Sequence, residues 1–212
     1  MRSLFALILV PSLLLSGCGA PTLALSDDPV TKAAQCGVVA TSFARTAQAD
    51  VKATLPFDAR VRVLHYALFA ATEGGGYDVS RAAAVLKTLP QVEREVTGGD
   101  WQALAPSCEL AFSETTAPSR LLTDPLQAEL GCSMLAAYVE GALQSQESVY
   151  ADSLQPIHAM RLALDGRIGA KLQGAGKGDV AQQKGPRDAA MHRIVRVGAA
   201  ADTLKACVRR FS

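Results

Sequence analysis

The sequence predicts an all-α protein built from two tandem, related four-helix units, each clamped by a disulfide. The skeleton Asp-Pro, six residues, Cys occurs twice, in "DPVTKAAQC" (28–36) and in "DPLQAELGC" (124–132), and these hold the only Asp-Pro pairs in the chain. Two later cysteines, in "CELAF" (108–112) and "CVRRF" (207–211), each precede a Phe by four residues, which is one helical turn. Alternating runs of Val, Ile and Thr, which are typical of strands, are absent.

The cysteine spacing indicates a duplication. Cys36 and Cys108 are 72 positions apart, and Cys132 and Cys207 are 75 apart. Such a repeated pattern is the mark of two related units. We place them at 28–114 and 124–212, joined by a linker at 115–123.

The four cysteines suit disulfides, because an even number of cysteines in an exported chain is usually paired. Three pairings are possible, and metal binding is a competing interpretation that the lack of a Cys-x-x-Cys hook disfavours. We predict the bonds Cys36–Cys108 and Cys132–Cys207, since copying a unit that already held its own bridge produces this arrangement directly. Crossed pairings would require interleaved units.

Each unit is expected to open with a helix that carries its first cysteine. Asp28 and Asp124 suit the N-cap, and Pro29 and Pro125 suit the first helical position, where the missing N–H costs nothing. Apolar residues then recur at three- and four-residue spacing, and the cysteine lies on this stripe.

Three further helices complete each unit. In the first unit we expect about 58–73, about 79–97 with an interruption at Pro90, and a closing helix capped by Asp100 and kinked at Pro106. In the second we expect about 156–172, a loop at 173–186 that contains four glycines and a proline, about 187–199, and a closing helix around Cys207.

The first 17 residues have the proportions of a secretory signal, because Arg2 precedes an apolar run that is shorter than the roughly 20 residues of a membrane span. The run ends in Leu15-Ser16-Gly17-Cys18, which resembles the lipobox of bacterial lipoproteins. The resemblance covers only these 18 residues. It implies that Cys18 is acylated, for example with palmitate, and begins a tether at 18–27. The alternative is an ordinary signal peptide cut near Gly19-Ala20.

The resemblance also implies a location. Gly19 follows the cysteine where an Asp would favour the inner membrane, so we expect a lipid anchor in the outer membrane that faces the periplasm. Two or three acyl chains anchor a protein stably, whereas one does so only marginally.

Charge gives no support for a nucleic-acid role, because the chain after residue 17 carries equal numbers of acidic and basic side chains, and no nucleic-acid partner is expected. From Arg167 onward, however, there are ten bases against three acids. This bias predicts a surface for an anionic partner, and we assign it to Arg193, Arg196, Arg209 and Arg210. A solvated helix face is the plainer interpretation.

Candidate catalytic residues are few. His65 lies on an apolar face and is expected in the core, while His158 suits a surface or helix start. His192 lies beside Arg193 and Arg196, which should lower its pKa. Glu73 and Glu140 are isolated, and Trp101 is expected to anchor the core.

The stretch "GAGKGD" (174–179) fails as a phosphate-binding loop, because Gly178 stands where Ser or Thr is required and no strand precedes it. No metal site or cofactor is expected. The sequence therefore favours a lipid-anchored helical scaffold or inhibitor with an envelope protein partner. The alternatives are a carrier of an apolar ligand and an enzyme acting on cell wall or lipid.

Overall fold

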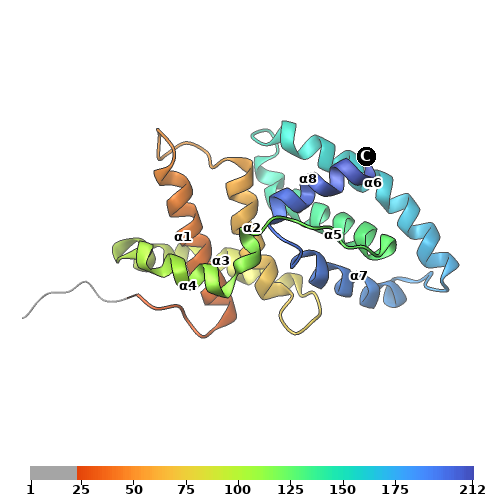
Figure 1. Ribbon diagram of the computed structural model, residues 1–212, viewed down its shortest axis with the longest axis horizontal. Coiled ribbons are helices and arrows are strands. Elements are labelled where there is room, and N and C mark those ends of the chain that lie inside the picture. The colour runs from red at the N-terminus through yellow and green to blue at the C-terminus, as the bar shows by residue number, and fades with distance from the viewer. Residues whose placement is uncertain (1–22) are drawn as a thin grey trace, which may run out of the picture.

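The protein is all-helical in the computed structural model, which describes residues 23–212 (Figure 1). No strand occurs in this range, so the all-α prediction is confirmed. The signal segment and Cys18 lie outside the described residues. The helices are α1 Pro29–Thr46, α2 Phe57–Ala71, α3 Val79–Gly98, α4 Ala105–Ala111, α5 Pro125–Leu143, α6 Ala151–Gly174, α7 Val180–Ile194 and α8 Ala200–Phe211, with 3₁₀ turns at Trp101–Leu104, Ser113–Thr115 and Gln144–Gln146.

The two Asp-Pro pairs start α1 and α5 as the sequence predicts. Asp28 Oδ2 accepts a hydrogen bond from the Thr31 backbone N–H at 2.8 Å, and Asp124 Oδ1 accepts one from the Gln127 N–H at 2.7 Å. Each aspartate therefore satisfies an N–H that has no partner within its helix.

Proline is the reason that several expected boundaries are wrong. Pro90, Pro156 and Pro186 lie inside α3, α6 and α7, so the predicted interruption and the long predicted loop are absent. Pro90 and Pro156 are exposed, where water can satisfy the carbonyls that they leave unpaired. The cap of α7 is Asp179, whose side chain accepts from the Gln182 N–H at 2.8 Å.

The closing helix of the first half also differs from expectation. Asp100 makes no side-chain cap hydrogen bond, and a 3₁₀ turn at Trp101–Leu104 precedes α4. Pro106 therefore lies in the first turn of α4 instead of kinking a longer helix.

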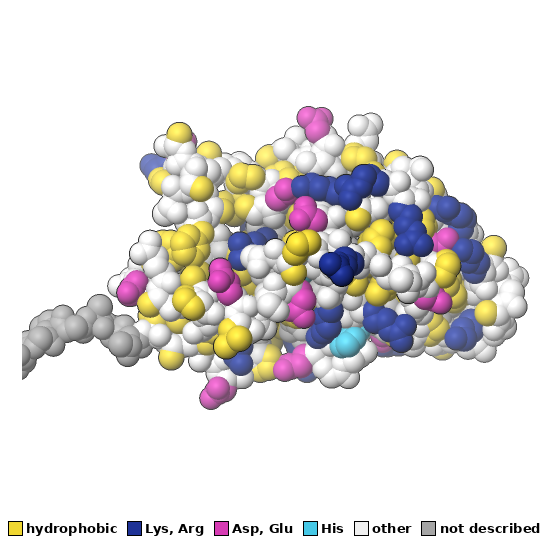
Figure 2. Space-filling model, in the orientation of Figure 1, with side chains coloured by type: hydrophobic (Ala, Val, Ile, Leu, Met, Phe, Trp, Pro, Cys, Tyr) yellow, Lys and Arg dark blue, Asp and Glu magenta, His cyan; other side chains and the backbone are white. Residues whose placement is uncertain are grey.

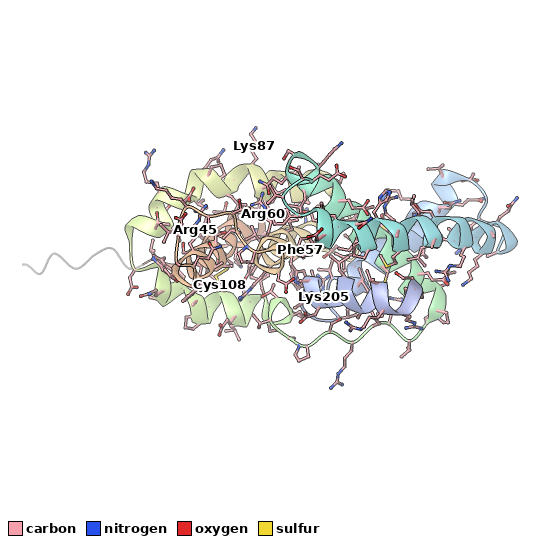
Figure 3. The ribbon with its side chains drawn as sticks, turned by 90° about the horizontal axis from the view of Figure 1, so that it is seen from above. Arg45, Phe57, Arg60, Lys87, Cys108 and Lys205 are labelled. Atoms are coloured by element: carbon pink, nitrogen blue, oxygen red, sulfur yellow. A yellow bond between two sulfur atoms is a disulfide. The ribbon has the colours of Figure 1, made fainter. Side chains whose placement is uncertain are left out.

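The two halves of the chain share one hydrophobic core. In the first half α1 packs against α2 and α3; in the second, α5 packs against α6, α7 and α8. Helix α2 contacts both α5 and α8, so it joins the halves, and the buried side chains of both halves form one continuous cluster. At the edge of this junction Lys205 Nζ of α8 lies 2.5 Å from Asp58 Oδ2 of α2. Phe57 and Lys205 lie close to each other there (Figure 3).

The linker between the halves is held by the second half. The Ala199 N–H donates to the Ala117 carbonyl and the Arg120 N–H donates to the Val197 carbonyl, both at 2.9 Å. Gly198 lies between these bonds with a φ of +134°, and a Cβ there would lie 2.6 Å from Ser119 Cα. Only glycine fits this close approach of two backbone segments.

Both predicted disulfides are confirmed. Cys36 is bonded to Cys108 and Cys132 to Cys207, which connects the first helix to the last in each half. Beside each opening cysteine a glycine allows a close helix approach: Gly37 faces Leu89 of α3, and Gly131 faces Ile194 of α7. The halves differ in the length of their closing helices, and their origin by duplication stays a prediction.

Candidate functional site

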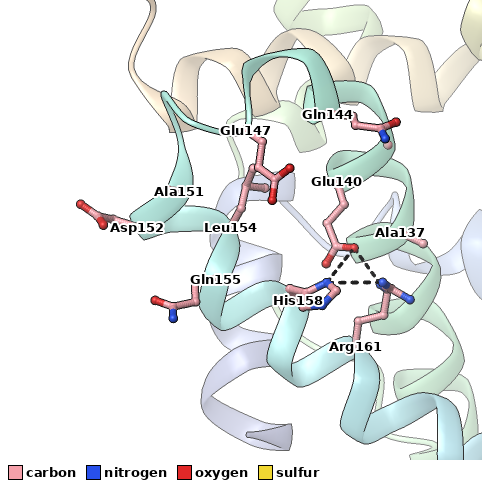
Figure 4. A pocket seen from close by; sticks show the side chains of 11 residues that line it. Ala137, Glu140, Gln144, Glu147, Ala151, Asp152, Leu154, Gln155, His158 and Arg161 are labelled. Atoms are coloured by element: carbon pink, nitrogen blue, oxygen red, sulfur yellow. Dashed lines mark hydrogen bonds and ion pairs between the residues drawn. The ribbon is translucent and has the colours of Figure 1, made fainter.

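A groove of about 800 Å³ lies between the end of α5 and the start of α6 (Figure 4). We call it the polar groove. Glu147 points into the space between the two helices, whereas Asp152 and Gln155 point outward. Its lining residues are Ala137, Glu140, Gly141, Gln144, Glu147, Ala151, Asp152, Leu154, Gln155, His158 and Arg161.

A chain of polar contacts fixes the floor of the polar groove. Arg161 Nε donates to Glu140 Oε2 at 2.8 Å, and Arg161 Nη1 donates to Asp165 Oδ2 at 3.1 Å. The hydroxyl of Ser133 donates to the other oxygen of Asp165 at 2.8 Å. The guanidinium of Arg161 therefore pairs with two carboxylates, and its bond to Glu140 links α6 to α5.

Two carboxylates of the groove are incompletely paired, and only that of Glu147 is open to a partner. Glu140 Oε1 is buried and has no hydrogen-bond partner among residues 23–212. Glu147 is exposed and has no cation within 4.0 Å in the same part of the chain. The groove thus keeps a net negative character after Arg161 is counted.

A second groove, of about 400 Å³, lies on the other side of α5 and separates it from α3. We call it the apolar groove. Its walls come from both halves of the chain: Tyr77, Val79, Ala83, Leu86, Met134, Ala137, Tyr138, Gly141 and Ala142. The Tyr138 hydroxyl is buried without a hydrogen-bond partner in the described chain, and burial raises its pKa.

The polar side chains of the polar groove are carboxylates, amides, one histidine and one arginine. No Ser, Thr, Cys, Lys or Tyr is among its lining residues, so no hydroxyl, thiol or amine nucleophile stands beside His158. His158 Nδ1 lies 3.6 Å from Glu140 Oε2, which is too long for a hydrogen bond. Glu147 and Asp152 are both exposed at the rim of the groove.

Comparison with known proteins gives no relative: no family model, no curated protein and no solved structure matches this chain. The function must therefore be argued from the residues themselves. Between residues 23 and 212 no group of three His, Cys, Asp or Glu side chains could hold a metal ion. In that range no helix is long and apolar enough to cross a membrane.

The three histidines fall in different environments. His65 is fully buried, as predicted, with Nε2 2.7 Å from the Val195 carbonyl oxygen. His158 lies on the exposed side of the polar groove. The pKa of His192 is lowered, as expected, although the largest cause is partial burial and the charges of Arg196 and Arg193 come second.

The other candidates of the sequence lie apart from the grooves. Trp101 packs edge-on against Phe43, with ring centroids 4.7 Å apart, at the side of the core. On the surface, Glu73 Oε2 lies 3.6 Å from Arg81 Nη1. The "GAGKGD" stretch is the exposed turn between α6 and α7, and its Asp179 is used as the cap of α7.

The four arginines assigned to an anionic partner do not form one surface. Arg196 is half-buried and donates to Thr72 Oγ1 and to the His192 carbonyl, both at 2.9 Å. Arg193 is exposed at the end of α7, while Arg209 and Arg210 lie at the far end of α8. Figure 2 nevertheless shows Lys and Arg side chains gathered over the half of the molecule that contains α6 to α8.

Arg167, which the sequence did not single out, completes a cluster at the end of α8. The guanidinium groups of Arg167 and Arg210 lie 5.9 and 5.2 Å from the centre of the Phe211 ring. They donate to the carbonyls of Phe211 and Leu122, not to carboxylates. With Arg209 they form the arginine cluster, and no acid lies within 4.0 Å of it in the described chain.

Sequence reasoning missed both grooves. Glu147, Tyr138 and Gly141 matter because α3, α5 and α6 meet around them, and no spacing in the sequence records that meeting. The signal that was available is Glu140, which stands on the edge of the apolar stripe of α5. A carboxylate in such a place requires a partner, and Arg161 is that partner.

Proposed function

We propose that this chain is a lipid-anchored protein of the bacterial envelope that works as a helical interaction module. The observation that carries the proposal is the pair of grooves along α5, which offer an apolar wall and the exposed, unpaired carboxylate of Glu147 but no hydroxyl or thiol nucleophile beside His158. Such a surface suits binding of a partner. An enzyme acting on cell wall or lipid would need converging catalytic groups.

The attachment of the N-terminal segment supports a position close to the membrane. Gln35 is buried, and its side chain accepts from the Ser26 N–H at 2.8 Å and donates to the Ala24 carbonyl at 3.3 Å. The chain from Leu23 is thereby fastened to α1. Only five residue steps separate Leu23 from Cys18, so an acylated Cys18 would hold the helical body within about 18 Å of the bilayer.

The arginine cluster is our proposed contact for an anionic envelope partner. It lies in the half of the molecule away from Leu23, since the described chain begins at one end of the long axis and α8 belongs to the other half (Figures 1 and 3). Exposed charges are screened over about 10 Å at 0.1 M salt, so this binding should weaken as salt is added. Binding that is indifferent to salt would exclude the cluster.

Acylation is tested by growing cells with labelled palmitate. Label should enter the wild-type chain, and the Cys18→Ser variant should remain unlabelled and unanchored. The other four cysteines are paired in disulfides and are not competing acceptors. Equal labelling of the two proteins would exclude the lipid anchor.

The carrier alternative is favoured by one observation, the apolar groove between α3 and α5. Both grooves are open at the surface, whereas a carrier normally encloses most of its ligand. Mass spectrometry of the protein purified from membranes separates the two functions. A stoichiometric lipid that is retained through gel filtration would favour the carrier.

A further inference from the structure

We propose that the two grooves along α5 form one docking site for a peptide segment of a partner protein, with a Lys or Arg beside aliphatic or aromatic side chains. This inference rests on the proposed function, because it names the partner chemistry of the interaction module. In this proposal the Lys or Arg of the peptide binds in the polar groove, and the adjacent aliphatic or aromatic side chains bind in the apolar groove.

The two grooves meet at α5. Ala137 and Gly141 line both of them, and these residues are one helical turn apart on the same exposed face. Both side chains are small, so only a low ridge separates the grooves. Above Gly141 nothing lies within 4 Å of the position that a Cβ would take. A bound segment can therefore cross α5 from one groove to the other.

The charge of the polar groove selects a cation. Arg161 already pairs with Glu140 Oε2, but Glu147 is exposed and points into the groove without a cation among the described residues (Figure 4). A Lys or Arg of the partner would supply the cation that Glu147 lacks.

The apolar groove selects the neighbouring side chains. Val79 is 62% exposed although it begins α3 beside this groove, and Met134 offers a flexible surface that adapts to different shapes. Tyr138 contributes to the same wall. Aliphatic or aromatic side chains of a bound segment would cover this apolar lining.

Other occupants fit these groups less well. A fatty acid or an anionic lipid would bring a negative charge to Glu147. A symmetric second copy would place the same patch against itself and so oppose acid to acid. A peptide with a basic residue meets both the charge and the apolar wall.

Two glycine variants test the site. In Gly141→Leu the new Cβ meets open space, and the rest of the side chain raises the ridge between the grooves, so it obstructs the crossing of a bound segment. Gly166→Leu is the matched control: Gly166 is also exposed within a helix, with nothing within 4 Å, but lies outside both grooves. Leucine is a better helix former than glycine, so both variants should fold.

The probe is a phage library of random 12-residue peptides, selected on the full chain in non-ionic detergent. Peptides enriched on the wild type should carry Lys or Arg beside Leu, Ile, Phe or Met. In fluorescence anisotropy Gly141→Leu should weaken such a peptide at least about tenfold, and Gly166→Leu should not. Glu147→Gln should weaken it about two- to fivefold at 0.1 M salt, and Glu109→Gln on α4 should leave it unchanged.

Three results would overturn the docking site: no enrichment, enriched peptides that lack basic residues, or equal binding to Gly141→Leu and the wild type. The readout is independent of acylation. A failure here with Cys18 still labelled would reject the groove and leave the anchor, whereas peptide binding without labelling would do the reverse.

Discussion

His65 Nε2 lies 2.7 Å from the carbonyl oxygen of Val195, and this bond joins α2 to the end of α7 at a completely buried point. The carbonyl can only accept, so Nε2 carries the proton. His65 Nδ1 has no partner among the described residues. Burial is the main cause that lowers the pKa of His65 to about 4; the bond to Val195 and Glu114 oppose the shift, while Arg196 and Arg62 add to it.

The first prediction is that His65 makes the fold sensitive to acid. Its pKa is lower in the folded chain than the ordinary value of 6.5, so the unfolded state binds the proton more readily. The full stability is present above pH 6.5 and falls as the pH drops towards 4. Between pH 7 and pH 5 this group alone should remove about 2 kcal/mol of unfolding free energy, measured by urea denaturation.

The control for this prediction is His65→Gln. Glutamine can still donate to the Val195 carbonyl but does not titrate, so the loss between pH 7 and pH 5 should shrink by most of that amount. His192→Gln serves as a comparison, because the pKa of His192 is also lowered but this residue is only partly buried. An unchanged pH slope in His65→Gln would contradict the assignment.

The sequence predicts what depends on neighbouring residues. Asp28 and Asp124 act within one helical turn, and the buried stripe around each opening cysteine follows from local periodicity, so the starts of α1 and α5 could be foreseen. Pro156 and Pro186 could not be assigned in this way. Whether a helix continues through proline depends on whether water reaches the freed carbonyl, which is a property of the folded surface.

The candidate site was harder to predict for the same reason. The basic bias of the second half was visible, but Arg196 is used inside the molecule, on Thr72 of the other half. Nothing in the spacing of these two residues indicates that they meet. The grooves likewise arise where helices distant in sequence diverge, so their lining residues have no shared motif.

The second prediction concerns the clamp on the N-terminal segment. Gln35→Leu removes both hydrogen bonds to residues 24 and 26, and we expect a loss of about 1–2 kcal/mol in stability. The Ser26 amide should exchange with solvent faster, as hydrogen-exchange mass spectrometry will report. The control Gln173→Leu changes an exposed glutamine of α6 and should leave exchange at Ser26 unaltered.

The third prediction concerns the ion pair in the polar groove. Arg161→Met leaves Glu140, whose side chain is only 18% exposed, without its cation, and we expect a loss of about 2 kcal/mol at pH 7. The double variant Arg161→Met, Glu140→Gln should lose less than the sum of the two single variants. Urea denaturation of all four proteins gives this coupling, and strict additivity would show that the pair does not interact.

The last prediction uses the disulfides to test whether the two halves unfold together. Each bond closes a loop of about 70 residues, which contributes about 4 kcal/mol in the chain-entropy account. Because α2 packs against α5 and α8 in one core, removing Cys132–Cys207 with alanines should lower the stability of the whole chain. Trp101, the only tryptophan, reports the first half, and circular dichroism reports all helices. In the alanine variant both signals should shift to the same lower denaturant concentration. If Trp101 fluorescence kept the wild-type midpoint while helicity was lost earlier, the halves would be separate folding units, and the buried bond from His65 to Val195 would not couple them.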